Sequence, residues 1–336
     1  MLDELALPLL AAPMAGGPST PALVRAAGAA GGLGFLAAGY KTVDDLAAEI
    51  AEVHDLPVFG VNLFVPNPVP VDPAEYRRYA EVVRKEADRY GVDVPATPRQ
   101  DDDEWDAKLA LLLDQPVPVV SLTFASPGRV VVNSLQKRGS YVIQTVTSPG
   151  EALVAGETGV DALAVQASSA GAHSGTFTPS RPPDEIPLIE LIAAVRAVSA
   201  LPVLAAGGLA TPADVAAAVA SGATAAMVGT VLLRSPESGA SATYKNALAD
   251  PTRTATVRTR AFTGRPARGL RNAFVDAHDT EAVQGYPAIH HLTSPLRRAA
   301  ALAGDPERIN IWAGTGWRHA EPRPAAHILR DLASGL

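Results

Sequence analysis

The stretch VDALAVQASSAGAHSGTF, residues 160–177, joins a buried strand to a glycine-rich loop. Residues 160–165 are largely apolar, which is typical of a strand covered on both faces. His173 is the one histidine of the loop, and it lies between Gly171 and Gly175. Glycine permits backbone conformations that other residues resist, and an imidazole exchanges protons near neutral pH. Because α/β proteins place their chemistry at the carboxyl ends of strands, we expect His173 to lie at a functional site.

Short apolar runs of this kind recur along the chain, and most are followed by a segment with the apolar spacing of a helix. The predicted strands are 7–12, 33–37, 58–64, 117–123, 141–146, 162–166, 202–206 and 225–229. The clearest predicted helices are 21–30, 43–53, 187–198 and 212–220, the last opening with a Thr211 cap and Pro212. Eight strand–helix units in about 250 residues predict an α/β fold of the (β/α)8 TIM barrel type rather than a doubly wound sheet.

Two segments interrupt the regular alternation of predicted strands and helices. Residues 66–105 form an insertion after the third strand, with a predicted helix at 74–89 and an acidic run at 101–104 that begins another. Residues 251–336 form a C-terminal extension with a last helix at 324–332. We expect residues 1–250 to form the barrel and the extension to pack over its mouth.

Composition excludes several classes of function. The chain has 336 residues, 47% of them hydrophobic and 19% charged, as in a globular protein with a large core. Its net charge is -7 and no basic run stands out, so we expect no nucleic-acid partner. Without cysteine, disulfides, thiolate nucleophiles and zinc–thiolate sites are excluded. The histidines lack ligand spacing, and the adjacent His290 and His291 would point apart in regular structure, so we expect no metal.

Membrane and export signals are also weak. Residues 215–233 carry no charge, but they are rich in alanine and contain Ser221 and Gly222, which favours a helix end, a turn and a buried strand. The first ten residues, MLDELALPLL, carry acids where a signal peptide carries positive charge. We expect a cytoplasmic protein without a membrane partner, and a homodimer is left open.

The ends of the seventh and eighth predicted strands favour a phosphate site. The seventh leads into AAGGLATP at 205–212, and the eighth ends in MVGT at 227–230. The backbone amides of Gly207 and Gly208 can approach an anion closely, and the helix that begins near Thr211 adds its positive end. Gly229 and Thr230 would close the other side, in the place where barrels commonly bind phosphate.

Neutral amide side chains at other strand ends indicate that the phosphate group belongs to a flavin cofactor rather than to a sugar-phosphate substrate. The first strand leads to Pro13 and Met14, and Asn62, Gln144 and Gln166 lie on the third, fifth and sixth strands. A flavin ring needs amide partners along its polar edge and an apolar seat beneath it. The alternative is that the three amide side chains only satisfy the backbone of nearby loops.

Several of these motifs resemble the nitronate monooxygenases, formerly called 2-nitropropane dioxygenases, of the bacterial class I branch. They are PMAGG at 13–17, FGVNLFVP at 59–66, QASSAGAHSGTF at 166–177, AAGGLATP at 205–212, MVGT at 227–230 and IWAGTG at 311–316. The resemblance implies a (β/α)8 barrel that binds FMN non-covalently without a metal. It places the catalytic histidine at His173. The implied FMN contacts are Pro13, Met14, Asn62, Gln166, Gly171, Gly208, Met227, Val228, Gly229 and Thr230.

The resemblance also implies the reaction, in which alkyl nitronates are oxidised by O2 to carbonyl compounds and nitrite. The chain departs from the family pattern near the substrate. Ala172 stands where a glycine is usual before the histidine, Ser174 follows it where arginine is commoner, and Met227 replaces a glutamine. The family pairs a tyrosine with a lysine eight residues later; Tyr286 matches the first, and Ser294 replaces the second. The expected substrate-binding residues are therefore Tyr286 and Ser294.

Two other functions are compatible with these residues. One is an NAD(P)H-dependent reductase of quinones or enoyl thioesters on the same barrel. The other is an FMN-binding protein without nitronate turnover.

Overall fold

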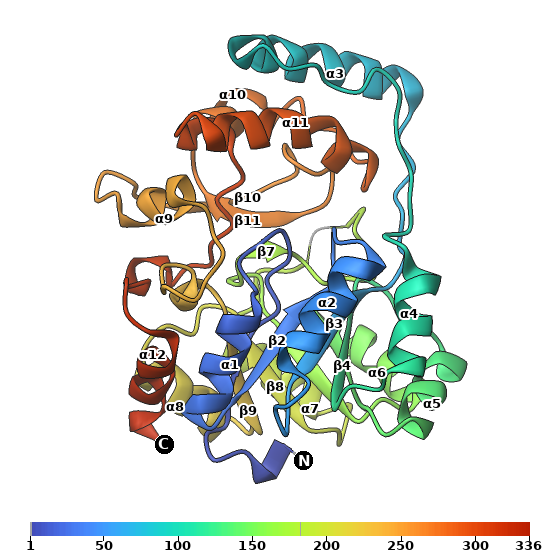
Figure 1. Cartoon of the computed structure of the whole chain (residues 1–336), viewed down its shortest axis with the longest axis vertical. Coiled ribbons are helices and arrows are strands. Elements are labelled where there is room, and N and C mark those ends of the chain that lie inside the picture. The colour runs from blue at the N-terminus through green and yellow to red at the C-terminus, as the bar shows by residue number, and fades with distance from the viewer. Residues whose placement is uncertain (1, 182) are drawn as a thin grey trace.

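The centre of the molecule is a closed barrel of eight parallel strands (Figure 1). The computed structural model describes residues 2–181 and 183–336. The barrel strands are β1 (Leu9–Ala11), β2 (Leu33–Ala37), β3 (Gly60–Phe64), β4 (Val119–Thr123), β5 (Tyr141–Val146), β6 (Ala162–Gln166), β8 (Val203–Ala206) and β9 (Ala225–Val228). Each overlaps one of the predicted apolar runs, and β9 pairs with β1 to close the barrel. The predicted (β/α)8 TIM barrel is confirmed.

A layer of helices surrounds the strands. It consists of α1 (Pro21–Ala30), α2 (Val43–Val53), α4 (Trp105–Asp114), α5 (Arg129–Lys137), α6 (Pro149–Thr158), α7 (Leu188–Arg196), α8 (Pro212–Ala220) and α12 (Ala325–Leu332). Thr20, Thr42, Ser148 and Thr211 begin four of these helices, and their hydroxyls accept hydrogen bonds from backbone N–H groups of the first turn. Such caps explain why α1, α2 and α8 begin where their sequence signals predict.

Two apolar layers hold the barrel together. Inside it, side chains from alternate strand positions contact one another, among them Leu10, Phe35, Ile143 and Leu204. The intervening positions face outward and pack against the helices in a second, larger cluster. This alternation decides which side chains at the strand ends point toward the axis of the barrel.

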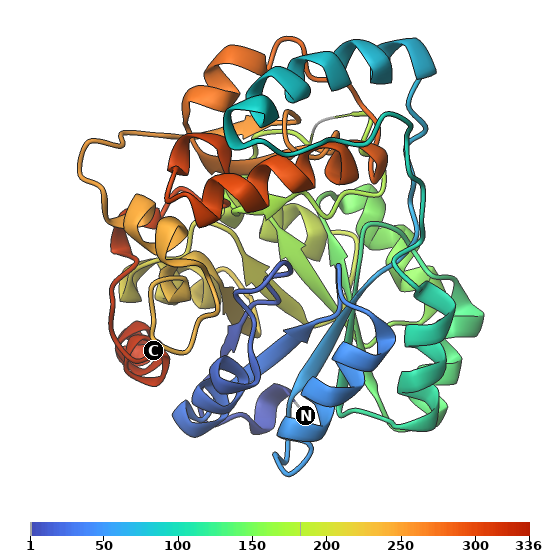
Figure 2. The same cartoon turned by 45° about the horizontal axis from the view of Figure 1, so that its top comes forward.

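A cap lies across the carboxyl ends of the strands (Figures 1 and 2). The insertion contributes α3 (Pro73–Ala87), and the extension contributes β10 (Thr256–Thr259), β11 (Ala267–Leu270), α10 (Ala273–His278) and α11 (Ala288–Leu302). The helix α9 (Ala242–Ala249) connects β9 to this region. The position of the last helix differs from our expectation: α12 lies against α1 and α8 at the side of the barrel and not over its mouth.

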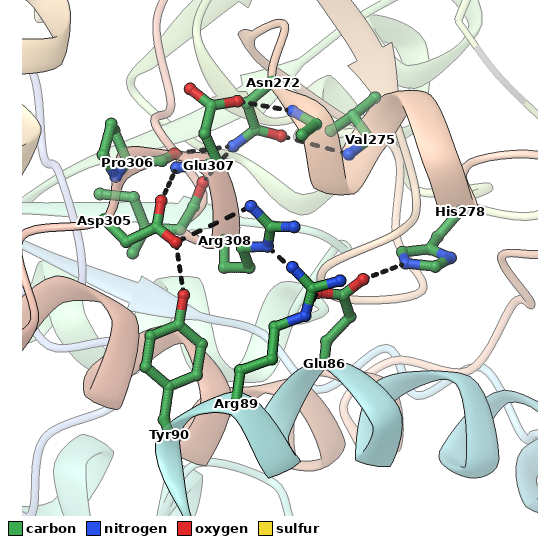
Figure 3. A network of polar contacts seen from close by, with 12 residues as sticks. Glu86, Arg89, Tyr90, Asn272, Val275, His278, Asp305, Pro306, Glu307 and Arg308 are labelled. Atoms are coloured by element: carbon green, nitrogen blue, oxygen red, sulfur yellow. Dashed lines mark hydrogen bonds and ion pairs between the residues drawn. The ribbon is translucent and has the colours of Figure 1, made fainter.

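The insertion and the extension are joined by an apolar cluster and by the polar network of Figure 3. Glu86, near the end of α3, is the centre of the network. Its carboxylate lies 3.2 Å from His278 Nε2, 3.1 Å from Arg308 Nε and 3.2 Å from Arg89 Nε. These neighbours hold the pKa of Glu86 below its usual value although burial opposes the shift. One carboxylate thus ties α3 to α10 and to the segment that follows α11.

The sequence gives no signal for one element, a three-stranded antiparallel sheet in the order β10-β11-β7. Its strand β7 (Ala172–His173) belongs to the glycine-rich loop, and His173 pairs with Ala267 of β11. The glycine-rich loop is therefore held in the sheet of the cap and does not project freely from the barrel. None of the helices in the described part of the chain combines the length and the hydropathy that a bilayer-spanning segment needs.

Candidate active site

A cavity of about 430 Å³ lies between the strand ends and the cap, within the usual size range of cofactor and ligand sites. Most of the residues predicted for a site line it. They are Pro13, Met14, Asn62, Gln166, Gly171, His173, Gly207, Gly208, Met227, Val228, Gly229, Thr230 and Ser294. The structure does not bring Gln144 or Tyr286 to the lining.

His173 is half-buried at the cavity wall, in an aromatic setting. Its Nε2 atom lies 2.9 Å from the Thr263 hydroxyl, and its ring centre lies 5.8 Å from Phe124 and 5.6 Å from each of Tyr286 and Trp312. Burial, reinforced by the positive charges of Arg265 and Arg297, lowers the pKa of His173 to about 3. The imidazole is therefore neutral at physiological pH.

The loop around His173 is held at both ends by one side chain. The Gln166 amide donates to the His173 carbonyl at 3.2 Å and accepts from the Gly175 N–H at 2.7 Å. At Gly171 a Cβ atom would lie 2.6 Å from the Ala313 carbonyl carbon, so only glycine fits against this part of the extension. The next residue, Ala172, has a φ of 66°, in the left-handed region. The backbone thus takes the conformation that the family's glycine favours, and Ala172 adopts it under strain.

The ends of β8 and β9 form a cradle of unused donors. In the described chain, the backbone N–H groups of Gly207, Gly208 and Gly229 have no hydrogen-bond partner. Thr230 lines the same wall, and its hydroxyl oxygen accepts a hydrogen bond from the Gly314 N–H at 3.0 Å, which leaves its hydrogen for a ligand. An anion fits such a group of donors.

The predicted contribution from the start of α8 is absent. The Asp214 carboxylate accepts from the N–H groups of Ala210 and Thr211 at 3.1 and 2.9 Å, and the Thr211 hydroxyl accepts from the Asp214 N–H. This helix end is satisfied by its own side chains, and neither Thr211 nor Pro212 lines the cavity.

The three strand-end amides have different roles. Asn62 donates to the hydroxyls of Ser121 and Thr123 at 2.9 Å each, and its oxygen has no donor in the described chain. Gln144 is fully buried and donates to the carbonyls of Leu122 and Thr145. The cavity is lined by Thr145 and not by Gln144, because successive side chains on β5 point to opposite faces. The cofactor role predicted for Gln144 is therefore not supported by its position.

Sequence reasoning missed two aromatic side chains that line the cavity, Tyr40 and His290. The Tyr40 ring stacks on His290 with centres 4.1 Å apart, and the Tyr286 hydroxyl donates to the Tyr40 hydroxyl at 3.2 Å. Burial raises the pKa of Tyr40 to about 12, holds the pKa of Tyr286 well above its usual value and holds that of His290 well below its usual value. All three side chains are thus uncharged at neutral pH. Tyr286 reaches the cavity through Tyr40 and His173 rather than directly.

The only charged side chains among the described lining residues are two arginines on α11. The Arg297 guanidinium is hydrogen-bonded within the protein. It donates to Asn310 Oδ1 at 3.0 Å, to the Thr293 hydroxyl at 3.0 Å and to the His290 carbonyl at 2.9 Å. Arg298 is exposed at the cavity edge. Two guanidinium groups without a lining carboxylate favour an anionic ligand.

Comparisons with known proteins agree with this arrangement. A family model described as nitronate monooxygenase matches residues 1–335. The chain belongs to the nitronate monooxygenase family. It is 32% identical to a "Probable nitronate monooxygenase" of Staphylococcus aureus, over 98% of this chain and 94% of that protein. The family assignment makes the chain an oxidoreductase and confirms the resemblance seen in its motifs.

Two solved structures are similar to this member of the nitronate monooxygenase family. The nitroalkane oxidase from Streptomyces ansochromogenes is 44% identical with a TM-score of 0.94, over 100% of this chain and 97% of that chain. FabK from Thermotoga maritima is 27% identical with a TM-score of 0.76, over 98% of this chain and 93% of that chain.

Proposed function

We propose that the protein binds FMN and uses O2 to oxidise alkyl nitronates to carbonyl compounds and nitrite. The observation that carries the proposal is a neutral imidazole at a cavity whose charged side chains, among the described lining residues, are arginines only. A nitronate is a small anion, so the positive charge favours its entry. A nitroalkane oxidase is among the similar structures.

The donor set of the cavity fits FMN. The amides of Gly207, Gly208 and Gly229, with the Thr230 hydroxyl, would hold the phosphate. Pro13 and Met14 would form the apolar seat of the ring, and the free oxygen of Asn62 would accept from its polar edge. Gln166, Gly171, Met227 and Val228 line the remaining wall. When bound, FMN supplies the electron transfer between nitronate and O2.

His173 would act on the substrate through Nδ1. The Arg265 carbonyl can only accept, so the Thr263 hydroxyl, 3.3 Å away, donates to it and accepts from His173 Nε2–H. The proton of the neutral ring then lies on Nε2, and Nδ1 keeps its lone pair. A bound anion favours the protonated ring, so the ring becomes more basic when substrate is present. The imidazole can therefore take a proton from a nitroalkane or orient its anion.

A second candidate is an NAD(P)H-dependent reductase of quinones or enoyl thioesters, and the likeness to FabK is the observation that favours it. The two functions differ in their electron donor. Under the first, NADH leaves the flavin oxidised in the absence of O2; under the second, NADH bleaches it rapidly. An FMN-binding protein without turnover would show neither nitrite formation nor bleaching.

The experiment combines the spectrum of the purified protein with a nitrite assay. We expect a yellow protein that releases nitrite from alkyl nitronates and from propionate 3-nitronate in air without NADH. His173→Ala should keep the flavin spectrum and lose turnover, whereas a variant that retains turnover removes His173 from the mechanism.

A further inference from the structure

Arg265 is a fully buried arginine without a carboxylate partner. Its side chain has no exposed surface, and in the described chain no carboxylate lies within ion-pair distance of it. Glu151 is the acid that acts on it, but the Glu151 oxygens are occupied by Thr147, Thr176 and Phe177. Burial lowers the pKa of Arg265 to about 10, so the group stays protonated at neutral pH. An unpaired buried charge strongly destabilises a fold, which calls for a functional reason.

The guanidinium holds the His173 loop from behind. Nε donates to the Ser174 carbonyl at 3.3 Å, and Nη2 donates to the Thr176 carbonyl. Nη1 is buried without a partner. Two of the residues that directly follow His173 are thus fixed by one planar group, whose geometry suits two separate acceptors.

The same guanidinium lies against Phe124. Its central carbon is 3.8 Å from the centre of the Phe124 ring and 5.9 Å from that of Tyr286. Phe124 has a φ of 89°, a strained conformation for a bulky residue, and its ring lines the cavity beside His173. The cation–π contact stabilises this ring in place.

We propose that Arg265 is a positioning residue that fixes the His173 loop and the Phe124 ring and supplies a permanent positive charge beside the imidazole. The inference rests on the proposed function, because it assigns to Arg265 the control of the group that acts on the substrate. Arg265 does not itself line the cavity and acts through His173 and Phe124, which do.

The positive charge of Arg265 affects the protonation of His173 because few other charged groups act on the imidazole. Arg265 and Arg297 are the charged groups that act on the imidazole, and both oppose its protonation. The nearest other titratable rings, Tyr286 and His290, are kept neutral by burial. Removing one of the two charges should therefore let His173 bind a proton at higher pH.

The test measures the protonation of His173 directly, by NMR of the 15N-labelled imidazole in the flavin-loaded protein, together with the pH profile of kcat/KM. In Arg265→Met we expect the His173 titration to move up by one pH unit or more and kcat to fall at least tenfold. Arg265→Lys keeps the charge but loses the planar fork, so the titration should stay low while kcat falls. Arg258→Met, on β10 and bonded to the Pro183 carbonyl, is the matched control and should change neither.

A folded Arg265→Met protein with an unchanged His173 titration would overturn the proposal. If Arg265→Met does not fold, Arg265→Lys decides, because wild-type kcat in that variant also overturns it. The NMR measurement does not depend on nitronate turnover. A protein without turnover would thus contradict the proposed function while the titration still tests Arg265.

Discussion

The His173 imidazole and the Thr263 hydroxyl lie 2.9 Å apart, and this hydrogen bond joins the loop after β6 to the C-terminal extension. The two residues are separated by 90 positions. The bond holds the ring in one orientation, with Nε2 toward Thr263. The imidazole of His173 is thus positioned by a segment that lies outside the eight barrel units.

Desolvation of the neutral His173 ring makes the folded state sensitive to acid. The pKa of His173 falls from 6.5 to about 3 on folding, so below pH 6.5 the unfolded chain binds a proton that the folded protein does not. Stability is complete above that pH and is lost as the pH falls toward 3. Urea unfolding of His173→Gln should show a pH dependence reduced by about 1.4 kcal/mol per pH unit at pH 5. His327→Gln, exposed on α12, should follow the wild type; equal slopes for all three proteins would contradict the desolvation of neutral His173.

Replacement of Ala172 by glycine should relieve backbone strain. Ala172 has a φ of 66°, a conformation that costs an L-residue about 1–2 kcal/mol and that glycine adopts without strain. Glycine also loses more conformational entropy on folding than alanine does, which offsets part of this stabilisation. We expect Ala172→Gly to raise the free energy of unfolding by about 0.5–1 kcal/mol. Ala167→Gly, with ordinary backbone geometry, should lower it. A destabilised Ala172→Gly protein would show that the left-handed conformation is not present.

The ion pair of Asp103 and Lys108 should support Tyr40. Lys108 Nζ lies 2.9 Å from Asp103 Oδ2 with the lysine 2% exposed, and Asp103 Oδ1 accepts from the Tyr40 N–H at 2.8 Å. Lys108→Met leaves the partly buried Asp103 carboxylate, which is 18% exposed, without its cation, a loss of at most about 3 kcal/mol. The double variant with Asp103→Asn should recover part of this stability.

Lys41→Met provides the control for that ion pair, since Lys41 is paired with Glu49 in a more exposed position. In urea titrations, Lys41→Met should lose less free energy of unfolding than Lys108→Met. A Lys108→Met protein as stable as the Lys41→Met protein would mean that Asp103 is not held as a partly buried carboxylate.

The Thr230 hydroxyl should contribute to FMN affinity. A hydrogen bond to a charged group is worth about 1.5–3 kcal/mol, so Thr230→Val should raise the Kd for FMN roughly tenfold or more, as measured by flavin fluorescence on titration of the apoprotein. Thr224→Val, outside the cavity lining, serves as the control. Equal affinities for the two variants would place the phosphate elsewhere.

The barrel could be predicted from the sequence because each buried strand is a continuous apolar run, and β2, β5 and β6 have the predicted bounds. The lining of the cavity could be predicted where it lies at strand ends. Gln144 was misplaced because its outward direction depends on register within β5, which an apolar run does not reveal. Arg265 and Tyr40 carry no local signal, since their roles arise from contacts with Ser174 and His290, far away in the chain.

The most direct test of the account is nitrite formation from alkyl nitronates by the purified protein in air, measured with O2 consumption and without NADH. The account predicts a yellow protein that consumes O2 and releases nitrite, with both activities lost in His173→Ala. A protein that forms no nitrite, or whose flavin is bleached by NADH in the absence of O2, would contradict it.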